Sequence, residues 1–200
     1  IINQYKTNKI TIGYKFGLEF MNSKNGRQFV SKLRNKIIFV DLKLNDTVNT
    51  MLSAVKALKD LKINYLTVHI SSGLAALKAV KKVSGSIKIV GVSTLTSLNN
   101  KDLKIIGYSR SVKNLVAHQA KLARRAGLDA IVRSPIELKI FRKIIKKEIV
   151  DDIDLATNLT PQQVCEALTK NTFYVALPLS CDMFSCVRLL RMWIVIVRDN

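Results

Sequence analysis

With 200 residues, the chain has the length of a single domain. Its 48% of apolar residues can form a hydrophobic core, and this composition, with only 8 Gly and 3 Pro, excludes disordered, collagen-like and low-complexity proteins. The 33 Lys and Arg residues outnumber 14 Asp and Glu residues and give a net charge of +19, but they are spread along the chain, which favours a solvated basic surface over a nucleic-acid partner.

Strand-like and helix-like segments alternate along the first two thirds of the chain, with a repeat of roughly 25 residues. The run from Ile37 to Leu44 is apolar except for two charged residues, which is typical of a buried parallel strand. Gly127 is predicted to end the longest helix, because glycine readily adopts the left-handed conformation after a last helical turn. In chain order we predict a strand at 9–16, a helix at 25–33, strands at 37–44, 65–70, 87–95 and 130–133, and intervening helices at 48–61, 73–82 and 112–126.

The pattern weakens beyond residue 147. Pro135 is expected to open a helix, since proline is well placed in a first helical turn. Further on we predict a strand at 148–155, a helix at 160–169 and a last strand at 192–198. The prediction is one barrel domain over 1–200, regular over 1–147 and divergent over 148–200.

The alternation of strands and helices implies a parallel sheet with right-handed crossovers. Both a doubly wound sheet and a (β/α)₈ barrel satisfy it. No GxGxxG or GxxxxGK[ST] motif follows any predicted strand, so the nucleotide-binding folds lose their main support. Five units in about 145 residues extrapolate to eight units near the usual barrel size of about 250 residues. We therefore predict an α/β protein of the TIM-barrel class.

The charged residues of the strand at 37–44 are the strongest candidates for catalysis. Side chains alternate along a strand, so Asp41 and Lys43 are predicted to lie on the same face. Asp46 follows at the carboxyl end of the strand, where barrel enzymes carry their active sites. An ammonium group flanked by two carboxylates stays protonated when buried and can act as a general acid. A surface cluster of salt bridges is the alternative interpretation.

The segment FVDLKLNDTVNTM at 39–51 resembles the signature of orotidine 5′-phosphate decarboxylases, which reads D-x-K-x-x-D followed by N-T. The related keto-gulonate-phosphate decarboxylases share D-x-K-x-x-D, but Asn49-Thr50 and the LTS at 95–97 favour the orotidylate branch. Four further segments resemble that family in the same order, namely GYKFGLEF at 13–20, LTVHISSG at 66–73, VGVSTLTS at 90–97 and AGLDAIVRSPIE at 126–137.

This resemblance implies a (β/α)₈ barrel that forms a homodimer with active sites at the subunit interface. The implied reaction converts orotidine 5′-monophosphate to uridine 5′-monophosphate and carbon dioxide, the last step of de novo pyrimidine synthesis. The family performs it without a metal or an organic cofactor. The small-molecule substrate and a second copy of the chain are thus the expected partners.

The resemblance also implies roles for individual residues. Lys43 is expected to deliver the proton, Asp41 to lie beside the substrate carboxylate, and Asp46 to reach into the partner's site. Lys15 is expected to contact the ribose and the other charged groups. The implied substrate-binding set is Lys15, Asp41, Lys43, Asp46 and Thr50, with Thr96 and Ser97 for the pyrimidine and Arg198 for the phosphate.

The chain also departs from the family pattern. The family's first strand, which carries an aspartate for the ribose, would lie before Ile1, and its last helix would lie beyond Asn200, so we expect a barrel that is incomplete at both ends. The seventh-strand pattern T-P-G-I-R is not found, and the nearest segment, 155–161, has no arginine. The eighth strand is placed either at 197–199, which supplies Arg198, or at 174–179, which supplies no arginine.

The remaining reactive residues give no further motif. Cys165, Cys181 and Cys186 fit neither a disulfide framework nor a metal-binding pattern, and His69 and His118 are interpreted as structural. The apolar stretch at 173–197 is interrupted by charged residues, which argues against a membrane span, and the chain shows no apolar signal-peptide region. We therefore expect a cytoplasmic protein.

Three hypotheses remain at this stage. The first is an orotidylate decarboxylase, which the Asp41–Lys43–Asp46 run favours. The second is a truncated or degenerate relative without activity, because much of the binding energy for such a substrate comes from its phosphate and the phosphate site is eroded. The third, a basic nucleic-acid-binding module, depends on the net charge alone.

Overall fold

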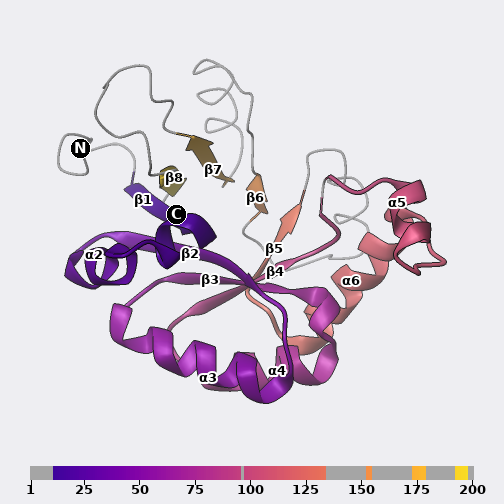
Figure 1. Ribbon diagram of the computed structural model, residues 1–200, viewed down its shortest axis with the longest axis horizontal. Coiled ribbons are helices and arrows are strands. Elements are labelled where there is room, and N and C mark those ends of the chain that lie inside the picture. The colour runs from indigo at the N-terminus through magenta and orange to yellow at the C-terminus, as the bar shows by residue number, and fades with distance from the viewer. Residues whose placement is uncertain (1–10, 96, 134–151, 155–172, 179–191, 198–200) are drawn as a thin grey trace.

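The computed structural model describes residues 11–95, 97–133, 152–154, 173–178 and 192–197, and the structure is given for these residues only. Strands and helices alternate over the first part of this range (Figure 1). The strands are β1 (Thr11–Gly17), β2 (Ile37–Leu44), β3 (Tyr65–His69), β4 (Lys88–Val92), β5 (Ala130–Arg133), β6 (Asp152–Asp154), β7 (Phe173–Pro178) and β8 (Met192–Val197). The helices are α1 (Leu18–Asn22), α2 (Gly26–Lys32), α3 (Val48–Leu58), α4 (Leu74–Val83), α5 (Asn100–Ile105) and α6 (Val112–Ala126), with short 3₁₀ turns at Lys59–Leu61 and Ile70–Ser72.

The eight strands form a closed barrel in the order β1 to β8. Each neighbouring pair from β1 to β7 is parallel, whereas β8 runs antiparallel to both β7 and β1. Because the sheet closes on itself, the structure confirms the predicted barrel and excludes the doubly wound sheet. The antiparallel last strand departs from a regular (β/α)₈ barrel, and it pairs the edges that β1 and β7 would otherwise expose.

The predicted strands at 9–16, 37–44, 65–70, 87–95 and 130–133 are confirmed as β1 to β5, and β6 and β8 lie within the strands predicted at 148–155 and 192–198. The predicted helices are confirmed as α2, α3, α4 and α6. The short helices α1 and α5 were not predicted, because five or six residues give too few turns for a hydrophobic period to emerge. The helices predicted to open at Pro135 and to span 160–169 lie outside the described residues.

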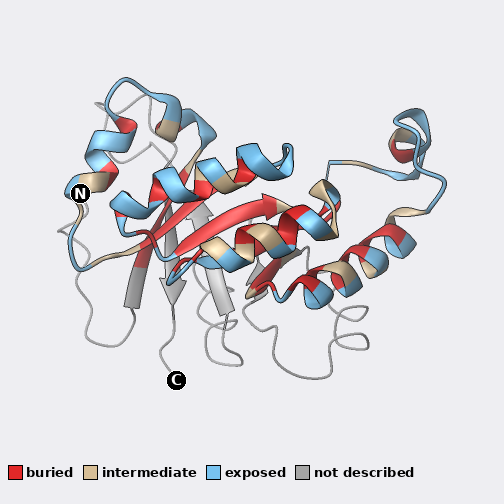
Figure 2. Ribbon diagram, turned by 90° about the horizontal axis from the view of Figure 1, so that it is seen from below, coloured by how far each residue is buried: buried red, intermediate tan, exposed pale blue. Residues whose placement is uncertain are grey.

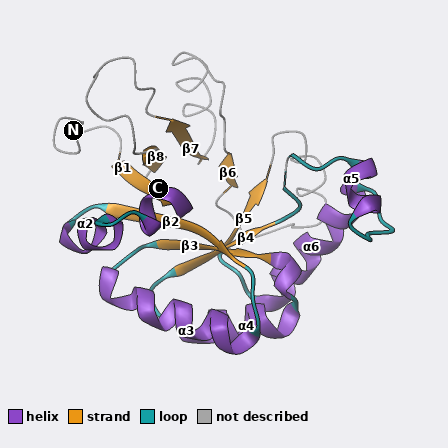
Figure 3. Ribbon diagram, viewed as in Figure 1, coloured by secondary structure: helices purple, strands orange, loops and turns teal. Residues whose placement is uncertain are grey.

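The helices α3, α4 and α6 cover the outer side of the strands (Figure 3). Each turns one face inward and leaves the other exposed (Figure 2). In α3 the buried face consists of Met51, Val55 and Leu58, at the spacing of successive helical turns. The helix α6 begins at Ser111, whose hydroxyl accepts a hydrogen bond from the Asn114 amide, and ends at Gly127, which has a φ of 72° as expected for its left-handed conformation.

An ion pair at the amino-terminal end of the sheet ties α4 to the strands. The Lys81 Nζ lies 2.6 Å from both carboxylate oxygens of Asp129, the residue that precedes β5. The same carboxylate accepts a hydrogen bond of 2.7 Å from the Ile89 amide in β4. In TIM barrels the amino-terminal end of the strands serves stability, whereas the opposite end carries the active site.

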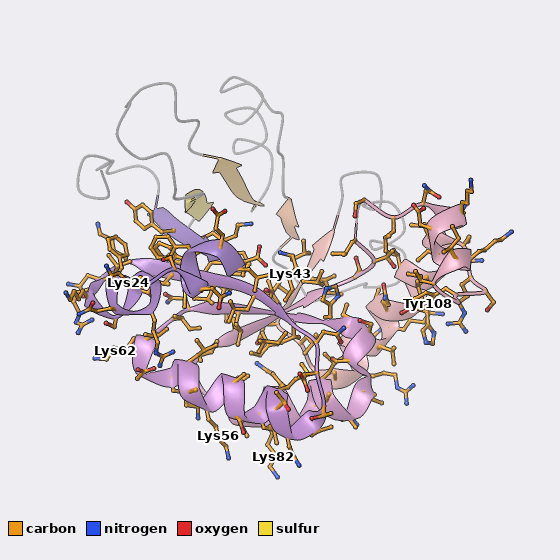
Figure 4. All side chains as sticks on the ribbon, in the orientation of Figure 1. Lys24, Lys43, Lys56, Lys62, Lys82 and Tyr108 are labelled. Atoms are coloured by element: carbon orange, nitrogen blue, oxygen red, sulfur yellow. The ribbon has the colours of Figure 1, made fainter. Side chains whose placement is uncertain are left out.

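Most of the positive charge on the described helices, and on the turns beside them, points into solvent. The labelled side chains of Lys24, Lys56, Lys62 and Lys82 project outward from the ribbon (Figure 4) and are all exposed. Such lysines are solvated and contribute little to the packing of the fold. Among the described residues, no helix is long and apolar enough to cross a membrane.

Gly26 offers a direct test of the packing at the start of α2. A Cβ atom at this position would lie 1.8 Å from the carbonyl oxygen of Phe20, a backbone atom that cannot move independently of its turn. We expect Gly26→Ala to lower the free energy of unfolding by about 1–3 kcal/mol. Gly17→Ala is the matched control, since a Cβ there meets nothing within 4 Å. Urea unfolding of both variants checks this, and equal midpoints would contradict it.

Candidate active site

The carboxyl ends of β1 and β2 bring the predicted catalytic residues together. The two strands are parallel neighbours, and their register pairs Lys15 with Phe39 and Gly17 with Asp41. Lys43 follows two residues after Asp41, and in Figure 4 it lies beside the strands, away from the outward-pointing lysines of the helices. Three charged side chains from two adjacent strands are therefore gathered at the end of the barrel where TIM-barrel enzymes carry their active sites.

Asp41 is the centre of this cluster. Its Oδ2 lies 3.0 Å from the Lys15 Nζ, and its Oδ1 lies 2.8 Å from the Lys43 Nζ. Lys15 and Asp41 are buried, with 4% and 5% of their surface exposed, whereas the Lys43 side chain is 31% exposed. Asp41 is thus fixed between two ammonium groups, of which that of Lys43 is the more exposed.

A hydroxyl group completes the contacts of Asp41. The Thr67 Oγ1, from β3, donates to the Asp41 Oδ1 at 2.9 Å and accepts from the Lys43 amide at 2.8 Å. Lys43 itself has a φ of 50°, in the left-handed region, and the pairing of β2 with β3 shifts its register between Val40 and Leu44. The backbone therefore leaves its regular strand geometry at the residue expected to deliver the proton.

Burial and the attraction of opposite charges together set the pKa values of Asp41 and Lys15. Burial acts to raise the pKa of Asp41, but the ammonium groups of Lys15 and Lys43 outweigh it and hold that pKa below its usual range. Burial lowers the pKa of Lys15, against the attraction of Asp41. Asp41 is therefore a carboxylate at neutral pH.

Asp46 belongs to a separate polar group at the start of α3. It is fully exposed, and its Oδ1 accepts a hydrogen bond of 2.6 Å from the Thr47 amide. That bond and a further one from Thr50 lower the pKa of Asp46. The hydroxyls of Thr47 and Thr50 lie 3.1 Å apart. The fold thus brings the predicted residues Asp46 and Thr50 together, but Asp46 forms no ion pair with Lys15 or Lys43 among the described residues.

The other predicted substrate-binding residues lie after β4 or near the end of the chain. Ser97 is exposed in the segment that follows β4. At the base of that segment, the buried Thr94 donates a hydrogen bond of 3.0 Å to the side-chain oxygen of Gln119 in α6, which anchors the loop to the helix. Thr96 and Arg198 lie outside the described residues, as do the three cysteines. No group of three or more His, Cys, Asp or Glu residues suited to a metal ion occurs in the described ranges.

Comparison with known proteins identifies the family of the chain. A family model described as "Orotidine 5'-phosphate decarboxylase / HUMPS family" matches residues 6–170, most of the chain. The chain belongs to this family. The orotidine 5'-phosphate decarboxylase of Wolbachia pipientis subsp. Culex pipiens is 42% identical over 138 residues, which cover 67% of this chain and 61% of that protein. The enzyme of the same name from Sphingopyxis alaskensis is 43% identical over 134 residues, which cover 66% of this chain and 59% of that protein.

Solved structures of the decarboxylase family share the fold. Orotidine 5'-phosphate decarboxylase from Lactobacillus acidophilus superimposes with a TM-score of 0.68 at 25% identity, covering 82% of this chain and 76% of that one. The enzyme from Methanocaldococcus jannaschii, complexed with the inhibitor BMP, gives a TM-score of 0.63 at 20% identity over 82% of this chain and 74% of that one, which supports the fold alone. The matches with the first two curated relatives span about three fifths of their length.

Two residues near the cluster of this decarboxylase-family chain were not predicted to belong to the site. Thr67 lies two residues before His69 on β3, and alternation places the two side chains on the same face. A hydroxyl within an otherwise apolar strand was the available signal, because buried polar groups require partners. His69 was interpreted as a core residue, but it is only half buried at the carboxyl end of β3.

His69 can report the charge of Lys43. Burial lowers the pKa of the His69 imidazole, the Lys43 ammonium lowers it further, and the Asp41 carboxylate acts in the opposite sense. We expect the imidazole to titrate below 6.5, and its midpoint to rise in a Lys43→Ala variant. Proton NMR of the His69 ring across pH 4–8 measures this midpoint. A midpoint that falls or stays constant in the variant would contradict the arrangement.

Proposed function

We propose that this chain carries the catalytic part of an orotidine 5′-monophosphate decarboxylase. Membership of the family supports this, together with relatives of that name at about 42% identity. The observation that carries the proposal is the Lys15–Asp41–Lys43 cluster, in which a carboxylate is held between two ammonium groups at the carboxyl ends of β1 and β2. Such a cluster matches a reaction in which negative charge leaves one atom and develops on its neighbour.

In the proposed reaction, the bond between the pyrimidine ring and the substrate carboxylate breaks. Its electron pair remains on the ring carbon, carbon dioxide leaves, and a proton from the Lys43 ammonium group forms the new C–H bond of uridine 5′-monophosphate. The ring carbanion cannot delocalise its charge, so a fixed cation beside it is the effective form of stabilisation. Lys43 meets this requirement because it is charged, partly exposed and held by Asp41 at 2.8 Å.

Asp41 and Lys15 prepare this step in the proposal. With its pKa below the usual range, Asp41 is ionised, and its carboxylate holds the Lys43 ammonium group at 2.8 Å. Lys15 offsets the charge of Asp41 from the other side at 3.0 Å, and we propose that it also contacts the ribose. The proposed reaction needs neither a metal nor an organic cofactor, since the leaving group is neutral and the stabilising charge is supplied by lysine.

The remaining predicted residues are proposed to hold the substrate. Thr96 and Ser97 would bind the pyrimidine, and Arg198 the phosphate. We also propose a cytoplasmic homodimer in which Asp46 reaches into the partner's site and Thr50 helps to bind the substrate. The exposure of Asp46 and its bond with Thr50 support this part of the proposal, because the two residues form an outward-facing pair at the start of α3.

A second candidate is a family member without activity. The T-P-G-I-R pattern is not found in the sequence. Weaker binding of the substrate phosphate would reduce turnover severely, because much of the binding energy comes from this group. The loss of ultraviolet absorbance of orotidine 5′-monophosphate on incubation with the purified chain distinguishes the two, with chromatography to identify uridine 5′-monophosphate. Product formation supports the decarboxylase. A folded chain that yields no product supports the inactive relative.

A further inference from the structure

Thr67 lies beneath the catalytic cluster without facing the mouth of the barrel. It is fully buried in the middle of β3, with 0% of its surface exposed. Its hydroxyl is within hydrogen-bond distance of two groups, the Asp41 Oδ1 at 2.9 Å and the Lys43 backbone nitrogen at 2.8 Å. One uncharged side chain therefore contacts both residues that are expected to act on the substrate.

The directions of these two hydrogen bonds follow from the chemistry of the groups. A backbone N–H can only donate, so the Thr67 oxygen must accept from Lys43. An ionised carboxylate can only accept, so the single hydroxyl proton of Thr67 must point to Asp41. The orientation of the hydroxyl group is therefore fixed by its two partners. In turn, the group fixes the distance between the backbone of Lys43 and the carboxylate of Asp41.

The backbone of Lys43 needs such a support. Its φ of 50° is unfavourable for a residue with a Cβ atom, and the shift in the β2–β3 register interrupts the regular ladder at this point. The Thr67 hydroxyl provides the acceptor that a regular ladder would provide for the Lys43 amide. The unusual conformation of Lys43 is thereby held in place by a side chain of the neighbouring strand.

We propose that Thr67 is a positioning residue for decarboxylation, which sets the Asp41 carboxylate and the Lys43 backbone in the geometry that aims the ammonium group at the substrate. This inference rests on the proposed function. Thr67 touches no substrate in this scheme. It acts through Asp41 and Lys43, and its contribution is to the chemical step and not to the affinity for the substrate.

The test compares two substitutions of the same residue. Thr67→Val keeps the shape of the side chain and removes the hydroxyl, whereas Thr67→Ser keeps the hydroxyl. We expect Thr67→Val to lower kcat by about 10–100-fold with a change in KM of about twofold or less, since misplacement of a catalytic group by about 1 Å costs rate of this order. Thr67→Ser should keep kcat within about threefold of the wild-type value, because it retains the hydroxyl group.

A second readout does not depend on activity. Carbon-13 NMR of the Asp41 carboxyl group gives its titration midpoint in each variant. The groups that face Asp41 are Lys15 from β1, Lys43 from β2, and Thr67 and His69 from β3. A donor to the carboxylate stabilises its ionised form, so the midpoint should rise in Thr67→Val and stay at the wild-type value in Thr67→Ser.

Ser84→Ala is the matched control for the loss of a buried hydroxyl. Ser84 is 1% exposed, and its hydroxyl donates to the Lys81 carbonyl at the end of α4, at the opposite end of the sheet. This variant should lose stability without a change in kcat or in the Asp41 midpoint. If Thr67→Val does not fold, Thr67→Ala replaces it in the comparison with Thr67→Ser.

The outcomes separate the two proposals. An inactive wild-type chain whose Asp41 midpoint rises in Thr67→Val overturns the proposed decarboxylation but supports the positioning of Asp41 by Thr67. An active chain with wild-type kcat and an unchanged midpoint in Thr67→Val overturns the positioning role. A variant in which KM rises while kcat is unchanged overturns it too, because the hydroxyl would then contribute to binding alone.

Discussion

Lys43→Ala is expected to lower kcat for decarboxylation by about 10⁴-fold or more. The substitution removes both the proton donor and the cation beside the developing carbanion, and each of these contributes about 10²–10⁴-fold in enzymes. No described neighbour can replace it, because Lys15 is 4% exposed and lies on the far oxygen of Asp41. The absorbance of orotidine 5′-monophosphate under single-turnover conditions measures the loss.

The fold should survive this substitution, so the loss of rate can be assigned to chemistry. The Lys43 side chain is 31% exposed, and without it Asp41 keeps its contacts with Lys15 and Thr67. Lys56→Ala is the matched control, an exposed lysine on the outer face of α3 whose loss should leave the rate unchanged. Residual activity within about tenfold of the wild type would contradict the assignment of Lys43 as the proton donor.

The contact between Asp41 and Lys43 is the part of the site that strand geometry alone predicted. Alternation places residues 41 and 43 on one face, and their side chains meet at 2.8 Å. The left-handed conformation of Lys43 was not predictable in this way, since no glycine or turn signal marks it. It depends on Thr67, a residue 24 positions away in the sequence, so only the assembled sheet reveals it.

The direction of β8 is a second feature that the sequence pattern does not contain. An apolar segment such as 192–197 has the same periodicity whichever way it runs, so the pattern predicts a strand but not its orientation. By contrast, the parallel arrangement of β1 to β5 was predictable, because a helix between two strands returns the chain to the starting side of the sheet. The relative direction of two neighbouring strands is therefore predictable from the connection between them and not from the strand residues themselves.

Asp41→Ala is expected to lower the free energy of unfolding by about 3–5 kcal/mol, besides abolishing activity. The substitution leaves the ammonium group of Lys15 buried without the carboxylate that offsets its burial, and removing one partner of a buried ion pair costs this much. Urea unfolding at pH 7 measures the change. Asp60→Ala is the matched control, because the Asp60–Arg27 pair is exposed and such pairs contribute only about 0–1 kcal/mol.

The difference in free energy of unfolding between wild type and Asp41→Ala should itself depend on pH. The folded pKa of Asp41 lies below the ordinary value of 3.8, so its contribution is present above pH 3.8 and is lost as pH falls through the folded pKa. The stability gap between wild type and Asp41→Ala should therefore narrow in acid. It should also narrow as pH rises toward 10.5, because the unpaired Lys15 of the variant deprotonates more readily when folded than when unfolded. If the stability difference between wild type and Asp41→Ala were equal at pH 3, 7 and 10, the loss of stability would come from packing. The charge of Asp41 would then not hold the cluster together.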